Sequence, residues 1–148
     1  KDVYNKILPV LRYMGKDILH CGKAGTGQLT KILNNMILFE TVVALSEAAN
    51  IAEQYGMNVE NLYQNITKCS GDSFALRNHG LKSIAKNNFP SPAFSSEYAL
   101  KDLSYALELG QKLNVKMPGA LSAENLLKTS IKNGDKDLYF PVMKKYFS

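Results

Sequence analysis

The sequence feature that most constrains the fold is a helical pattern of apolar residues running from Thr26 to about Tyr55. The apolar side chains extend beyond one stripe, which predicts a helix buried on most of its sides. They are Leu29, Ile32, Leu33, Met36, Ile37, Phe39, Val42, Val43, Leu45, Ala48, Ala49, Ile51 and Ala52. At 1.5 Å per residue the helix would span on the order of 45 Å. Gly56 offers a C-terminal stop. A buried helix of this length predicts an all-α bundle around one central axis.

Shorter elements are predicted on both sides of this helix. Residues 1–16 have helical spacing with Gly15 as a stop, and Asp17–Cys21 is a short strand-like run. Because one strand without a partner is unusual, we expect it to be the last strand of a sheet upstream that this chain does not contain. The later helices are predicted from a cap at Asn58 to Lys68, over 74–87, from Ser95 or Ser96 to Leu113, from Pro118 to Asn133 and over 138–147. Residues 23–148 contain no convincing strand, so we expect them to form an all-helical second domain.

Composition indicates a cytoplasmic globular protein. No apolar run reaches the ~18 residues that a membrane span needs, and residues 1–6 are not those of a signal peptide. The net charge is +5, but the lysines are scattered, which argues against a nucleic-acid partner. The two cysteines, Cys21 and Cys69, are interpreted as reduced thiols. No spacing of ligands suggests a metal site.

Three glycines, Gly22, Gly25 and Gly27, lie just before the long helix. A glycine-rich loop that enters a helix can bring backbone N–H groups close to an anion. The pattern is not a P-loop, because Gln28 stands where that motif needs lysine, and it lacks the third glycine of a dinucleotide fingerprint. From spacing alone, a tight turn that serves only packing remains an alternative.

Lys31 and Asn35 lie one turn apart on one face of the long helix. If that face is buried, the lysine loses hydration and can exchange a proton near neutral pH. The asparagine can donate hydrogen bonds to a substrate oxygen. The pair suits chemistry on a hydroxyl or carbonyl of a small polar substrate, although a surface lysine is the common alternative.

The spacing Gly22-x-x-Gly25-x-Gly27-x-x-x-Lys31-x-x-x-Asn35 resembles the catalytic motif of the β-hydroxyacid dehydrogenases, the group of 3-hydroxyisobutyrate dehydrogenase and tartronate semialdehyde reductase. The resemblance implies that Lys31 is the general acid/base. It implies that Asn35 positions the substrate, and that Gly25 and Gly27 let the helix start approach substrate and cofactor.

A second motif, Lys101-Asp102-Leu103-x-x-Ala106, resembles the cofactor-side motif of the same family, and Phe94 stands at the matching distance before it. Taken alone, Lys101 and Asp102 would be an exposed charge pair. The resemblance implies that Lys101 contacts the nicotinamide cofactor, NAD or NADP, while Phe94 and Asp102 line or support the site.

The resemblance also implies an N-terminal Rossmann domain, of which residues 1–22 would be the tail, and a homodimer or homotetramer. We therefore expect residues 23–148 to be a catalytic and dimerisation domain that is inactive alone and binds its cofactor mainly through the Rossmann domain. A small hydroxyacid or its semialdehyde would be the substrate. Two alternatives remain: a non-catalytic helical dimerisation domain, and a relative of the 6-phosphogluconate dehydrogenases, which carry a His-Asn pair where this chain has Asn34-Asn35.

Overall fold

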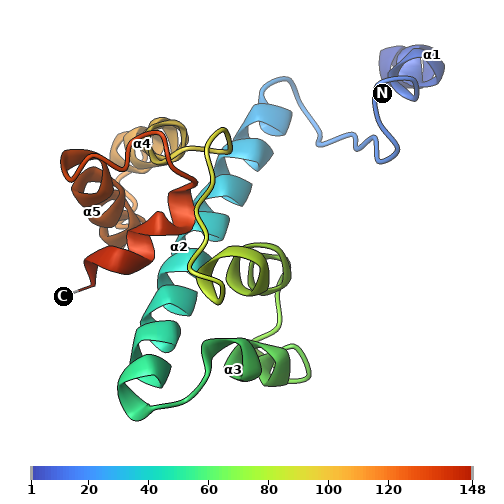
Figure 1. Cartoon of the computed structure of the whole chain (residues 1–148). Helices are drawn as coiled ribbons and strands as arrows, with labels where there is room; N and C mark the ends of the chain where they lie inside the picture. The colour runs from blue at the N-terminus through green and yellow to red at the C-terminus, as the bar shows by residue number, and fades with distance from the viewer. Residues whose placement is uncertain (1, 148) are drawn as a thin grey trace.

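A single 30-residue helix, α2 (Thr26–Tyr55), forms the axis of the fold. The structure is a computed structural model that describes residues 2–147. Figure 1 shows α4, α5 and η2 on one side of α2, with α3 and η1 on the other. The elements in chain order are α1 (Asp2–Leu11), α2, α3 (Val59–Ile66), the π-helix η1 (Leu76–Ile84), α4 (Ser96–Lys112), α5 (Pro118–Lys132) and the 3₁₀ helix η2 (Phe140–Tyr146). The predicted all-α bundle around one central helix is confirmed.

The core begins in the middle of α2. From Phe39 onward this helix buries seven side chains, and α3, α4, α5, η1 and η2 all pack against it. Its first three turns are different, since Leu33 is 38% exposed and Ile37 is 60% exposed. The prediction that α2 is buried on most sides is therefore wrong for these turns, because α2 buries no side chain before Phe39, although Asp102 of α4 contacts Lys31 and Asn35 there.

By length and composition alone, α2 is also apolar enough to cross a membrane. A third of the relevant stretch is buried inside the protein. The central helix of a folded bundle passes the same test, and five other elements pack against this one. The core therefore accounts for the apolar residues that α2 buries from Phe39 onward.

Local signals in the sequence set most helix ends. Gly56 ends α2 in the left-handed conformation, with φ 84°. Asn58 accepts a hydrogen bond from the amide of Asn61 at 2.9 Å, and Ser95 accepts one from the amide of Tyr98 at 3.3 Å. These caps fix where α3 and α4 begin.

The region before α2 differs from its prediction. Helix α1 ends at Leu11, five residues before the expected end, in a run of tight turns. Residues 17–21 have no regular secondary structure, and no strand among residues 2–147 pairs with them. The expected strand, whose partner would lie in a sheet upstream, stays a prediction. The Tyr4 hydroxyl donates to the carbonyl of Ile18 at 2.9 Å. Helix α1 makes no contact with any other described helix and lies apart from the bundle in Figure 1.

A backbone clamp holds the start of α4. Residues 136–140, which lead into η2, run beside residues 90–97, which lead into α4. The clamp consists of four amide-to-carbonyl bonds, from Tyr139 to Pro90 (3.2 Å), Phe140 to Phe94 (3.0 Å), Ser96 to Leu138 (3.0 Å) and Glu97 to Lys136 (3.2 Å). The end of the chain thus fixes the loop that carries Phe94.

Candidate active site

Asp102 joins the two sequence motifs in space. Its Oδ2 atom accepts a hydrogen bond from the Lys31 ammonium at 2.5 Å and another from the Asn35 side-chain amide at 2.8 Å. Lys31 and Asn35 come from α2, whereas Asp102 comes from α4. One carboxylate oxygen therefore fixes both side chains of the predicted catalytic pair.

The packing of α4 explains why Asp102 faces α2. Ala99, Leu103 and Ala106 form the buried stripe of α4, and Asp102 lies within this stripe with its side chain 11% exposed. A carboxylate at such a position needs a charged or hydrogen-bonding partner. Lys31 and Asn35 supply that partner. The alternative of an exposed Lys101–Asp102 charge pair is wrong for this reason.

Lys31 itself is only half buried, with 49% of its side chain exposed. The expectation of a desolvated lysine is therefore wrong within this chain, because the first turns of α2 lie outside the core. An ammonium group has three N–H donors. Asp102 uses one of them, so the exposed head can donate to a further oxygen.

The two other predicted cofactor-side residues have separate places. Phe94 is partly buried and stacks on Phe39, with ring centroids 6.0 Å apart. Phe39 lies one turn after Asn35 on α2, which puts Phe94 at the base of the site. Lys101 is exposed, and its Nζ lies 4.8 Å from the centroid of the Tyr98 ring.

The structure gives a reason for glycine at position 25 but not at position 27. Gly25 is the N-cap of α2 with φ 92°, a conformation that favours glycine. Gly27 has helical backbone, and a Cβ placed on it would meet no atom of this chain within 4 Å. The fold explains the first glycine, but nothing among residues 2–147 requires the second.

Sequence reasoning missed a buried polar pair behind the site. Nδ1 of His79 is hydrogen-bonded to the Tyr139 hydroxyl. Burial lowers the pKa of His79 and raises that of Tyr139, so both groups are neutral at pH 7. The pair is 60 residues apart in the sequence, and no local pattern links the two positions. By contrast, the apolar spacing of α4 could have revealed Asp102 as a buried carboxylate.

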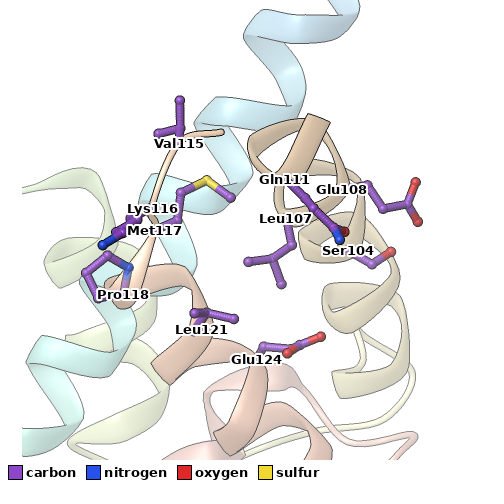
Figure 2. A pocket seen from close by; sticks show the side chains of 10 residues that line it. All are labelled: Ser104, Leu107, Glu108, Gln111, Val115, Lys116, Met117, Pro118, Leu121 and Glu124. Atoms are coloured by element: carbon purple, nitrogen blue, oxygen red, sulfur yellow. The ribbon is translucent and has the colours of Figure 1, made fainter. Parts of the chain in front are cut away.

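A separate groove lies away from the cluster around Asp102. It has a volume of ≈ 670 Å³ and runs between the second half of α4 and the start of α5, as Figure 2 shows. Its apolar wall includes Leu107, Met117 and Leu121. None of its ten lining residues is a predicted site residue. The predicted catalytic pair lies in the hydrogen-bonded cluster on α2 and α4, away from this groove.

Comparison with known proteins identifies the family. Residues 25–146 match the family described as "NAD-binding of NADP-dependent 3-hydroxyisobutyrate dehydrogenase". The chain belongs to this family. Membership in the 3-hydroxyisobutyrate dehydrogenase family confirms the predicted resemblance and the predicted cofactor class, NAD or NADP. The family consists of NAD(P)-dependent hydroxyacid dehydrogenases.

Individual relatives of this chain are named as dehydrogenases of the same kind. The 2-(hydroxymethyl)glutarate dehydrogenase of Eubacterium barkeri is 38% identical over 116 residues, which cover 78% of this chain and 38% of that protein. The mitochondrial 3-hydroxyisobutyrate dehydrogenase of Drosophila melanogaster is 31% identical over 151 residues, covering 96% of this chain and 47% of that protein. A solved structure of the Mycobacterium tuberculosis 3-hydroxyisobutyrate dehydrogenase with L-serine has a TM-score of 0.86 at 30% identity, covering 98% of this chain and 51% of that one. The chain thus spans about half the length of these relatives, or less.

Proposed function

We propose that this chain supplies the proton-transfer side of the active site of an NAD(P)-dependent β-hydroxyacid dehydrogenase. The observation that carries the proposal is the shared Asp102 oxygen, which holds Lys31 and Asn35 while the Lys31 ammonium stays half exposed. A cation fixed in this way is oriented before substrate arrives, which reduces the entropy lost on forming the reactive geometry.

The names of the relatives support a substrate class. 3-Hydroxyisobutyrate, 2-(hydroxymethyl)glutarate and L-serine each carry a hydroxymethyl group on the carbon that bears a carboxylate. We propose a substrate with the same unit, or the semialdehyde that its oxidation produces. An oxygen of this unit is the atom that Lys31 and Asn35 would bind.

In the direction of reduction, Lys31 gives a proton to the aldehyde oxygen while a hydride reaches the aldehyde carbon, and a primary alcohol results. The nicotinamide, when bound, supplies that hydride. Asn35 donates to the same oxygen or to the neighbouring carboxylate. Asp102 holds the Lys31 side chain in place while the proton is transferred. In the direction of oxidation, the alcohol proton returns to Lys31 as the hydride leaves carbon.

The start of α2 suits the approach of a cofactor. Gly27 leaves open space where a side chain would stand, and Leu29 and Leu33 on the same first turns of α2 are more than a third exposed. On this proposal Gly25 and Gly27 border the substrate and cofactor, with Phe94 and Lys101 on the nicotinamide side. We expect a dinucleotide-binding domain, with residues 1–22 as its tail, to hold most of the cofactor.

The test of the proposal is Lys31→Ala in a protein that joins this chain to a dinucleotide-binding domain. We expect kcat to fall by about 10²–10⁴-fold, the usual contribution of a general acid/base, with the Kd for NADH or NADPH unchanged. Near-native turnover would exclude Lys31 as the acid/base.

A second experiment tests cofactor binding. In a fluorescence titration of this chain alone we expect no clear NADH or NADPH signal. Tight binding would contradict the dependence on a second domain.

The exposed apolar residues of α2 favour a second candidate function, association with another helical surface. Leu29, Leu33 and Ile37 are all at least 37% exposed on its first turns. A chain with such a surface is expected to self-associate. Sedimentation velocity of the native chain and of Leu33→Lys would test this. Association of the native chain, together with unchanged turnover in Lys31→Ala, would favour a non-catalytic dimerisation domain.

A further inference from the structure

His79 is a buried histidine of η1 with three aromatic neighbours, Phe74, Tyr139 and Phe140. It is 9% exposed, and its ring centroid lies 5.3 Å from that of Phe140 and 6.1 Å from that of Phe74. Its Nδ1 is hydrogen-bonded to Tyr139, whereas its Nε2 has no partner among the described residues. An unpartnered buried nitrogen costs free energy. A phenylalanine would fill this space without that cost, so the histidine contributes its directional bond to Tyr139.

Tyr139 connects His79 to the site. It lies in the backbone clamp that residues 136–140 make with residues 90–97. The loop in this clamp carries Phe94 and leads directly into α4, which carries Asp102. His79 itself belongs to η1, which packs against α2. The side-chain bond therefore ties the loop before α4 to the element that packs on α2.

A chain of aromatic contacts runs from the pair toward the site. The Phe140 ring lies 5.3 Å from the ring of Tyr139, 5.2 Å from that of Phe39 and 5.7 Å from that of Phe94. Phe39 is one turn along α2 from Asn35. Aromatic contacts thus lead from the His79–Tyr139 pair through Phe140 to Phe39, one helical turn from Asn35.

The geometry points to His79 as a positioning residue. Through Tyr139 it fixes the loop that carries Phe94 and the start of α4, so that Asp102 meets Lys31 and Asn35 at hydrogen-bond distance. The inference rests on the proposed function for its catalytic consequence. The surrounding η1 is a nine-residue π-helix, a rare conformation that often occurs at functional sites.

Matched substitutions separate this role from packing. Tyr139→Phe keeps the ring and removes only the hydroxyl. His79→Asn keeps a polar atom near Nδ1, whereas His79→Gln places one near Nε2 instead. If the bond positions Asp102, His79→Asn should behave like the native protein and the other two variants should not. If His79 serves only packing, Tyr139→Phe should be silent.

The first measurement uses this chain alone and needs no activity. In a ¹H–¹³C spectrum of lysine-labelled protein, the ε-methylene signal of Lys31 (assigned with Lys31→Arg) reports its contact with Asp102. We expect this signal to shift in Tyr139→Phe and His79→Gln and to stay in His79→Asn. The signal of Lys128, which pairs with Glu124 on α5, is the internal control. A Lys31 signal that stays in place in Tyr139→Phe overturns the inference.

The second measurement is kinetic, in a protein that also contains a dinucleotide-binding domain. We expect Tyr139→Phe and His79→Gln to lower kcat by about tenfold, because small misplacements of catalytic groups are costly. KM should change less, and His79→Asn should restore kcat. Equal kcat in all variants overturns the inference. If the native protein has no dehydrogenase activity, the proposed function fails, and the Lys31 signal still decides the positioning role.

Discussion

The ammonium of Lys31 lies 2.5 Å from Oδ2 of Asp102, although the two residues are 71 positions apart in the sequence. The contact joins a half-exposed cation to a largely buried carboxylate. Because Asn35 donates to the same oxygen, loss of the carboxylate would release two side chains at once.

Asp102→Asn tests this arrangement. The substitution keeps the shape of the side chain and removes its charge, so Lys31 loses the anion that orients it. We expect kcat of the joined dehydrogenase to fall by at least about tenfold. Asp72→Asn, at the exposed ion pair with Arg77, is the matched control and should leave kcat unchanged. Full activity of Asp102→Asn would show that the ion pair has no part in turnover.

Gly27→Ala should separate stability from activity. The position is helical and an added Cβ meets no atom of this chain, so alanine should raise the free energy of unfolding by up to about 1 kcal/mol. Activity should nevertheless fall if substrate or cofactor approaches there. Gly25→Ala is the contrast, since its φ of 92° should make the variant about 1–2 kcal/mol less stable. Urea denaturation and steady-state kinetics check both. A Gly27→Ala enzyme with native kcat and KM would favour the tight-turn interpretation of the glycines.

Local patterns predicted the helices well because caps and breakers act within a few residues. Asn58, Ser95 and Pro118 each mark a helix start that the structure confirms. The burial of α2 was predicted less well. Apolar residues at its start have helical spacing, yet Leu33 and Ile37 remain exposed, since spacing does not reveal which neighbours are present.

The strand expected over residues 17–21 stays a prediction. A strand exists only through hydrogen bonds to a second strand, and the expected partner lies in a sheet upstream rather than among residues 2–147. Contacts between residues far apart in the sequence could not be predicted from local patterns either. Nothing near His79 in the sequence points to Tyr139, and only the fold brings them together.

His79 should make the free energy of unfolding depend on pH under acidic conditions. Burial lowers its pKa, so below about pH 6.5 the unfolded chain binds a proton that the folded chain resists. The free energy of unfolding should therefore decrease as the pH falls below that value. Urea midpoints at pH 7.5, 6.5 and 5.5 measure the slope, which His79→Asn should reduce. His20→Asn, at an exposed position, is the control. An identical slope in native protein and His79→Asn would contradict this assignment.

Three of the eight tyrosines should resist ionisation at alkaline pH. Burial raises the pKa of Tyr63 and Tyr139, and burial together with the Asp135 carboxylate raises the pKa of Tyr146 to about 12. Because the unfolded chain loses these protons near pH 10, stability should decrease as the pH rises above that value. Absorbance at 295 nm should show three late-ionising groups.

Tyr63→Phe isolates the deepest of these groups. It should remove one late-ionising group from the alkaline titration, since the Tyr63 side chain is fully buried. Its hydroxyl donates to the carbonyl of Leu45 at 2.6 Å, so the variant should also be about 1–2 kcal/mol less stable in urea at pH 7. Tyr55→Phe, at an exposed position of α2, is the control for both measurements. If Tyr63→Phe unfolds at the native urea midpoint, the Leu45 carbonyl does not depend on this bond, and the link between α3 and α2 rests on apolar packing alone.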